Sequence, residues 1–250
     1  MPQYKFPKRG PIRFILKSLI YIALGIFTKL EIVGKERMPR GPFVLAANHF
    51  SFADPVVLIR ITPWKTNFIA GAVAGFAPKW ATYFPKMWGA FWVHRGTGSR
   101  DALRSAEGWL KSGGVLCIFP EGGAWAQILR PPRPGTAYLT TRGDAPILPV
   151  GIVGLENLFP LRLINRPVVK INIGQPFGPF EVKGRGRQRR EQLDQIGHTI
   201  MEKIAELLPE ENRGRYSDDP AIREAAKEFE AYPWEDAVEG EVRGSGGAIH

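Results

Sequence analysis

A histidine and an aspartate that could act together as a base stand five positions apart, as His49 and Asp54 in the run NHFSFADP of residues 48–55. Residues at i and i+5 share a helix face less well than residues at i and i+4, so a pair requires a loop that folds back toward a helix start. Asp54-Pro55 predicts that start, because aspartate is a preferred N-cap and proline suits the first helical position. Asp54 would then hold one imidazole nitrogen as N–H and leave the other as a base. On spacing alone, the alternative is that Asp54 is only a cap and His49 an ordinary loop histidine.

No protein nucleophile accompanies this pair in the sequence. The G-x-S-x-G pattern of hydrolases is absent, and the single cysteine, Cys117, lies within an apolar run where burial is expected. One cysteine and four histidines provide neither a disulfide framework nor a multi-cysteine metal site, so a reducing, cytoplasmic setting is the default. The His–Asp pair therefore predicts a base that activates a substrate hydroxyl directly.

The elements that must position this pair are those of an α/β domain with a mostly parallel central sheet flanked by helices. Continuously apolar strands alternate with helical patterns, which is typical of parallel sheets covered on both faces. The expected strands are residues 30–34, 43–47, 67–70, 90–93, 115–119, 147–153 and 168–173, and the expected helices are 12–28, 55–61, 99–111, 136–142, 188–208 and 220–232. Ligands of such sheets bind beyond the carboxyl ends of the strands. Polar residues follow three of these strands: Asn48 and His49, His94 and Arg95, and Glu121.

The N-terminal region, residues 1–29, is basic and apolar at once. Residues 12–28 predict one helix on which Arg13 and Lys17 share a face. Between Lys17 and Lys29 only 11 residues are uncharged, whereas a bilayer span needs about 20 apolar residues. We therefore expect a membrane-associating helix that lies in the interface, with its basic residues at anionic headgroups, and a protein that is peripheral or monotopic on the cytoplasmic face of the cell membrane. A core-packing helix and a cleaved signal peptide are the alternatives.

The charge of the chain predicts an anionic partner. The 250 residues include 34 Lys and Arg and 24 Asp and Glu, a formal net charge of +10. Residues 217–243 carry nine acids and three bases, so this part is −6 and the remainder is +16. Nucleic acid, a membrane lipid surface and a phosphorylated substrate would all suit the remainder, but no RNA-binding motif is present and nucleic acid is not expected. We assign residues 30–209 to the main domain and residues 210–250 to an acidic, partly disordered tail that takes no part in anion binding.

Four short motifs follow one another between residues 30 and 174. They are Asn48-His49 through Asp54, Phe91-Trp92-Val93-His94-Arg95, Phe119-Pro120-Glu121-Gly122, and Ile147-Leu148-Pro149-Val150. In this order they resemble the motifs of the glycerolipid acyltransferase family, whose best-known members are the 1-acylglycerol-3-phosphate (lysophosphatidic acid) acyltransferases. Any one of them alone would be weak, and the ordered set makes chance a poor explanation.

The resemblance implies transfer of a fatty acyl group from acyl-CoA or acyl carrier protein to the free hydroxyl of a lysophospholipid, with no metal and no bound cofactor. It implies that His49 is the general base, that Asp54 orients it, and that Arg95 grips the phosphate of the acceptor. The further substrate-binding residues implied are Asn48, Glu121, Gly122 and Gly123. Glu121 would hydrogen-bond the polar head of the acceptor or hold Arg95.

The sequence departs from the family pattern at two places. The third motif commonly continues as E-G-T-R-S, and here it reads Glu121-Gly122-Gly123-Ala124-Trp125, without the arginine. The second motif often has aspartate before its arginine, where this chain has His94. Arg130 and Arg133 would be additional phosphate contacts. Both departures concern the acceptor head, which leaves lysophosphatidate, another lysolipid or a glycolipid as the acceptor.

Overall fold

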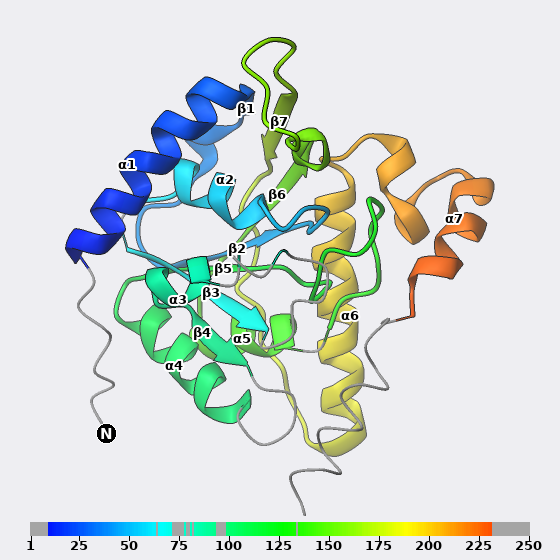
Figure 1. Ribbon diagram of the computed structural model, residues 1–250. Helices are drawn as coiled ribbons and strands as arrows, with labels where there is room; N and C mark the ends of the chain where they lie inside the picture. Colours follow the sequence, from blue (N-terminus) through cyan, green and yellow to red (C-terminus); the bar gives the residue numbers. More distant parts are fainter. Residues whose placement is uncertain are drawn as a thin grey trace, which may run out of the picture.

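The computed structural model describes residues 10–63, 65–71, 78, 81, 83–93, 99–133 and 135–231. In this part of the chain seven strands form one sheet, in the order β1-β7-β6-β2-β5-β3-β4 (Figure 1). The strands are β1 (Lys29–Val33), β2 (Phe43–Ala47), β3 (Thr66–Gly71), β4 (Phe91–Val93), β5 (Val115–Ile118), β6 (Ile147–Val153) and β7 (Val168–Ile173). Neighbouring strands run parallel except for β6 and β7, which are antiparallel. The predicted fold class is confirmed.

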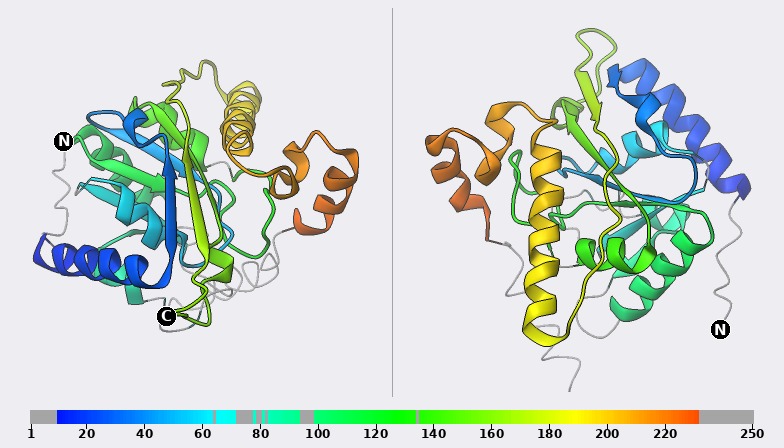
Figure 2. Two further views of the ribbon diagram at one scale, coloured as in Figure 1. Left: turned by 90° about the horizontal axis from the view of Figure 1, so that it is seen from above. Right: turned by 180° about the vertical axis from the view of Figure 1, so that it is seen from behind.

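Helices cover both faces of the sheet (Figures 1 and 2). One layer contains α1 (Gly10–Phe27), α2 (Asp54–Ile61) and α3 (Tyr83–Trp88), and the other contains α4 (Ser99–Lys111), α5 (Gly135–Gly143) and α6 (Gly186–Ala205). Along β2, Phe43 and Leu45 pack in the first layer, whereas Val44 and Ala46 pack in the second. Successive side chains of a strand point to opposite faces, so a strand between two helical layers must be apolar throughout. This requirement explains the uninterrupted apolar runs of the sequence.

The order of the strands brings together residues that are far apart in the chain. β2 lies between β5 and β6 and is parallel to both. The carboxyl ends of these three strands therefore meet at one edge of the sheet, where β2 leads into residues 48–53 and β5 leads into residues 119–122. The His–Asp turn and the Glu121 turn are thus neighbours in space.

The two charges of α1 point into the protein, so the prediction that they meet lipid headgroups is wrong. Arg13 and Lys17 are only 8% and 9% exposed. Arg13 Nε donates to the carbonyl of Trp88, the last residue of α3, at 2.9 Å, and Lys17 Nζ donates to the carbonyl of Thr62, which ends α2. The last carbonyls of a helix have no partner within the helix and carry its partial negative charge. These two helix ends attract the cations inward.

The outer face of α1 is apolar as a consequence. Its large exposed hydrophobic side chains are Ile12, Phe14, Ile15, Leu19, Tyr21, Ile22 and Ile26. By length and composition α1 could also cross a membrane. A second group of exposed apolar side chains lies in the loop from β6 to β7: Phe159, Leu161, Leu163 and Ile164. Arg166, in the same loop, connects it to α1: its Nη1 donates to the carbonyl of Gly25, near the end of α1, at 2.9 Å. The two apolar surfaces are therefore neighbours.

Candidate active site

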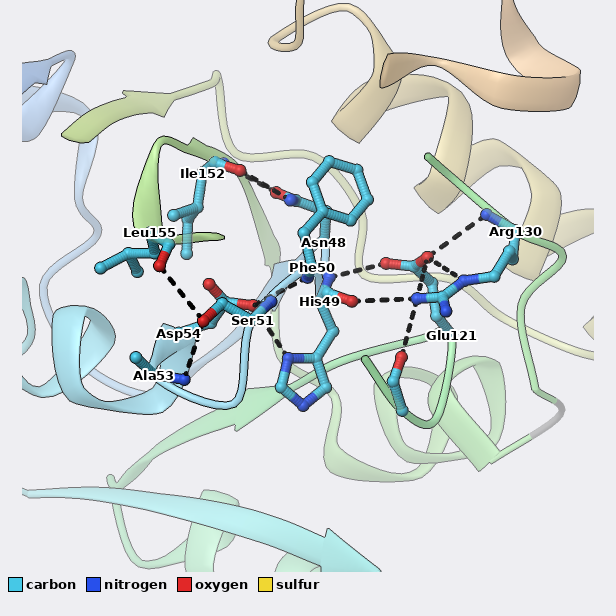
Figure 3. Close-up of polar contacts among 11 residues, drawn as sticks. Asn48, His49, Phe50, Ser51, Ala53, Asp54, Glu121, Arg130, Ile152 and Leu155 are labelled. Carbon is cyan, nitrogen blue, oxygen red and sulfur yellow. Dashed lines mark hydrogen bonds and ion pairs between the residues drawn. The ribbon is translucent and has the colours of Figure 1, made fainter. Parts of the chain in front are cut away.

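His49 and Asp54 form a buried pair at the carboxyl end of β2 (Figure 3). His49 Nδ1 lies 2.9 Å from Asp54 Oδ2, and the same oxygen accepts hydrogen bonds from the main-chain N–H groups of Phe50 and Ser51, each at 2.9 Å. The predicted contact between the two side chains is confirmed. The predicted capping role is wrong, because Ala53 is the N-cap of α2 and Asp54 is its first residue. The Asp54 carboxylate turns back toward the loop and fixes both the loop and the ring.

The imidazole of His49 also lies against an aromatic ring. Its centroid is 4.1 Å from that of Phe119, and the two rings are inclined by 18°. Phe119 directly follows β5, the neighbour of β2 in the sheet. An imidazole bound at Nδ1 by a carboxylate and stacked on its face has one preferred orientation, which is what a base acting at Nε2 requires.

Asn48 has a structural role in place of the substrate contact that the family resemblance implies. Its side chain is fully buried, and its Nδ2 donates to the carbonyl of Ile152 while its Oδ1 accepts from the N–H of Ile152, both at 2.7 Å. The amide thus pairs with β6 as another peptide group would, one step beyond the last residue of β2. Asn48 ties the start of the His49 loop to the sheet.

Glu121 likewise faces the protein, which corrects its assignment to acceptor binding. It is 1% exposed, its Oε1 accepts from the main-chain N–H of His49 at 2.6 Å, and its Oε2 is 2.7 Å from Nη2 and 2.8 Å from Nε of Arg130. Burial raises the pKa of the Glu121 carboxyl, and the Arg130 guanidinium beside it opposes that shift. The counter-ion of Glu121 among the described residues is Arg130, and Arg95, which the sequence analysis gave as one alternative, lies outside them.

Arg130 is a site residue whose role the sequence did not reveal. Its guanidinium is 1% exposed, and its Nη2 donates to the carbonyls of His49 at 2.9 Å and Gly123 at 2.7 Å. Its Nη1 has no hydrogen-bond partner within the described residues, and its Cζ lies 3.8 Å from the centroid of the Trp125 ring. A buried guanidinium that makes these contacts is not exposed to bind a phosphate. The indication in the sequence was that the third motif contains Glu121 but lacks the arginine that commonly follows it.

Of the remaining candidate residues, Gly122 lies in the described part of the chain, whereas His94 and Arg95 do not. Gly122 has a φ of 80°, and a Cβ atom added there would lie 3.1 Å from Arg133 Cγ, so a left-handed turn and close packing both favour glycine. β4, which His94 and Arg95 follow, is three strands away from β2, or about 14 Å at the usual spacing between strands. No group of three or more potential metal ligands occurs among the residues that the structure describes.

Comparison with known proteins gives a consistent result. Residues 29–153 match the family model described as Acyltransferase. Over 230 residues the chain is 22% identical to a 1-acyl-sn-glycerol-3-phosphate acyltransferase of Saccharomyces cerevisiae, a match that covers 89% of this chain and 73% of the relative. The crystal structure of the 1-acyl-sn-glycerophosphate acyltransferase PlsC from Thermotoga maritima is similar in fold, with a TM-score of 0.51 and 20% identity over 80% of this chain and 83% of that one. The region matched by the family model contains all four motifs.

Proposed function

Because the chain belongs to the acyltransferase family, we propose that it transfers a fatty acyl group from an acyl thioester, acyl-CoA or acyl carrier protein, to the free hydroxyl of lysophosphatidate, giving phosphatidate. The observation that carries this proposal is the 2.9 Å contact between His49 and Asp54 within the matched region. The names of the yeast and Thermotoga relatives support lysophosphatidate as the acceptor. Another lysophospholipid or a glycolipid is the alternative acceptor for the same chemistry.

The proposed step needs only the base and the two substrates. His49 Nε2 removes the proton of the acceptor hydroxyl while its oxygen attacks the thioester carbonyl carbon, so that a C–O bond forms. The C–S bond then breaks, and the departing thiolate takes up the proton from the imidazolium. Asp54 keeps Nδ1 as the protonated nitrogen before the attack and stabilises the imidazolium after it. General-base assistance of this kind typically contributes about 10²–10⁴-fold to the rate.

Two further parts of the proposal concern the acceptor and the donor. Arg95 would bind the acceptor phosphate, since the second motif places an arginine beyond the carboxyl end of β4 and guanidinium groups suit phosphate. No resident cofactor or metal takes part in the proposed step. Acyl-CoA and acyl carrier protein supply the same thioester, and both carry phosphate that the basic part of the chain would attract.

We also propose that the protein works on the cytoplasmic face of a membrane, as a peripheral or monotopic protein. The inward orientation of Arg13 and Lys17 leaves α1 with an apolar outer face, and Leu163 and Ile164 in the adjoining loop are 70% and 81% exposed. Large exposed apolar surfaces mark membrane or protein contacts. The ring of Phe159 in that loop stacks on Phe52 of the His49 loop, with 5.5 Å between centroids, and this contact supports a proposed site that adjoins the apolar surface. No nucleic acid takes part.

The experiment is a turnover assay with the full-length protein in mixed micelles. We expect thiol release from acyl-CoA that depends on lysophosphatidate, with phosphatidate as the product, and a loss of about 10²-fold or more in His49→Ala. Retained activity in His49→Ala would refute the mechanism. Turnover of other lysolipids but not of lysophosphatidate would identify the alternative acceptor.

A further inference from the structure

A segment outside the region that matches the family model packs against the active-site turns. Residues 210–231, here named the C-terminal brace, contain two short 3-10 turns (Glu210–Asn212 and Gly214–Tyr216), helix α7 (Pro220–Ala226) and a third turn (Lys227–Phe229). In Figure 1 the brace lies beside the upper part of α6 and the green loop that follows β5. We name residues 123–130 of that loop the motif loop. The sequence had suggested an acidic, partly disordered tail at this place, with a helix over residues 220–232.

The brace is held on α6 and holds the motif loop. Tyr216 binds α6 through its hydroxyl, which lies 2.8 Å from His198 Nδ1. Toward the motif loop, the carbonyl of Asn212 accepts from the N–H of Leu129 at 2.9 Å, and Asn212 Nδ2 donates to the carbonyl of Gln127 at 2.7 Å. Trp125 Nε1 donates to the carbonyl of Phe229 at 3.1 Å. Three hydrogen bonds thus fix the loop at three successive points.

Gly214 shows how close this contact is. A Cβ atom added there would lie 2.2 Å from the carbonyl oxygen of Leu129, which is far shorter than any non-bonded contact between carbon and oxygen. The residue also has φ 55, in the left-handed region that favours glycine. The brace and the main chain of the motif loop therefore touch directly at the residue before Arg130.

Arg130 continues the connection from the motif loop to the proposed base. Its guanidinium lies on the ring of Trp125, and its Nη2 binds the carbonyl of His49 at 2.9 Å. Glu121, paired with Arg130, accepts from the N–H of His49 at 2.6 Å. Both main-chain polar groups of His49 are therefore held by one buried ion pair, and Leu129, the residue before that arginine, is fixed by the brace.

We propose that the C-terminal brace is a positioning element for His49, acting through the motif loop, Arg130 and Glu121. The proposal rests on the proposed function, since it concerns the base of that reaction. Misplacing a reacting group by about 1 Å can lower a rate about 100-fold, so a small shift of the motif loop is enough to matter. The brace contacts no substrate in this scheme, and its effect should appear in kcat rather than in KM for the acceptor.

The test compares two glycine substitutions in the full chain. Gly214→Ala forces the brace away from Leu129, whereas Gly186→Ala, at φ 61 with nothing within 4 Å of the added Cβ, imposes similar backbone strain without a contact. We expect kcat of Gly214→Ala to fall about 10- to 100-fold with KM for the acceptor unchanged, and kcat of Gly186→Ala to stay within about twofold of the wild type. Equal kcat values for the two variants, measured well below both melting temperatures, would overturn the proposal.

A second measurement does not depend on turnover. The chain has four histidines, so the imidazole signals of 15N-histidine-labelled protein are few enough to assign with a His49→Ala reference. We expect Gly214→Ala to shift the Nδ1–H signal of His49 and Gly186→Ala to leave it in place. An unmoved signal in folded Gly214→Ala would refute the positioning role. If the wild type fails to acylate lysophosphatidate, this spectrum still decides whether the brace controls His49.

Discussion

The buried pair of Glu121 and Arg130 leads to a sharp prediction about stability and pH. In Arg130→Met the unbranched side chain keeps much of the packing on Trp125 but removes the charge. Glu121 then loses contacts at 2.7 and 2.8 Å, and the carbonyl of His49 loses one at 2.9 Å. Removing one partner of a buried ion pair costs about 3–5 kcal/mol, because the other charge remains without compensation. For a protein of this size that loss corresponds to roughly 6–20 °C in Tm, at about 2–4 °C per kcal/mol.

The loss should depend on pH in a direction that the structure determines. Burial already raises the pKa of Glu121, and without Arg130 its pKa in the folded variant rises further. Between the unfolded value, about 4.3, and that raised value, the folded state holds a proton that the unfolded state has released. The free energy of unfolding of Arg130→Met must therefore fall as pH rises through this window. The wild type falls with it up to its own raised pKa of Glu121, so the difference between the two proteins grows only between that pKa and the higher one of the variant, by up to about 1.4 kcal/mol per pH unit.

Glu121→Gln is the matched control for this effect. It leaves Arg130 buried without a counter-ion. Because arginine stays protonated at all accessible pH values and a glutamine at position 121 does not titrate, the free energy of unfolding of this variant should lack the fall with pH that is expected for Arg130→Met. The assay is urea unfolding of the wild type and both variants in detergent between pH 5 and 8, with tryptophan fluorescence as the readout. A free-energy difference between Arg130→Met and the wild type that does not change with pH would refute the reasoning.

Three further predictions follow from other contacts. Asp54→Asn keeps an oxygen for the loop N–H groups but removes the charge that stabilises the imidazolium, so kcat should fall about 10²–10⁴-fold with little change in Tm; steady-state kinetics and a thermal melt check this. Leu19→Asp should abolish flotation with anionic vesicles while Lys17→Met should not, because the leucine faces outward and the lysine inward; the opposite pattern would restore the sequence-based orientation of α1. Hydrogen bonds from the Ser217 hydroxyl and the Asp218 N–H lower the pKa of Glu210. The stability that Glu210 contributes to the brace should therefore persist at neutral pH and be lost as pH falls through that lowered pKa. Hydrogen exchange of the brace would detect this loss.

The sequence predicted the strands well because burial on both faces leaves a local signature. Residues 147–153 and 168–173 were expected as strands and are β6 and β7. The contact of His49 with Asp54 was also predictable, since both partners lie within one turn and the next helix start. The six-residue helix α3 was not predicted, because it contains a proline and is too short for a periodic pattern.

What the sequence could not supply were the partners that lie far along the chain. Nothing local tells that Glu121 pairs with Arg130, because the intervening loop must first be folded by contacts with residues 210–231. The same reason explains the error about Asn48: an asparagine at a strand end suits a ligand as well as a neighbouring strand until the strand order is known. Charge composition alone likewise could not show that part of the acidic segment supports the site.

The orientation of α1 shows why charge spacing is ambiguous in an apolar helix. Arg13 and Lys17 at i and i+4 define a face, but the same face can turn to headgroups or to protein carbonyls. The structure offers carbonyls at the ends of α2 and α3, which accept from both cations. Once these cations are bound inside, the uninterrupted apolar side of α1 faces outward. The two charges therefore favour membrane contact because they are absent from that exposed face, and not because they bind headgroups there. A cation that looks like an obstacle to lipid contact in the sequence is thereby removed by the fold from the exposed face of α1.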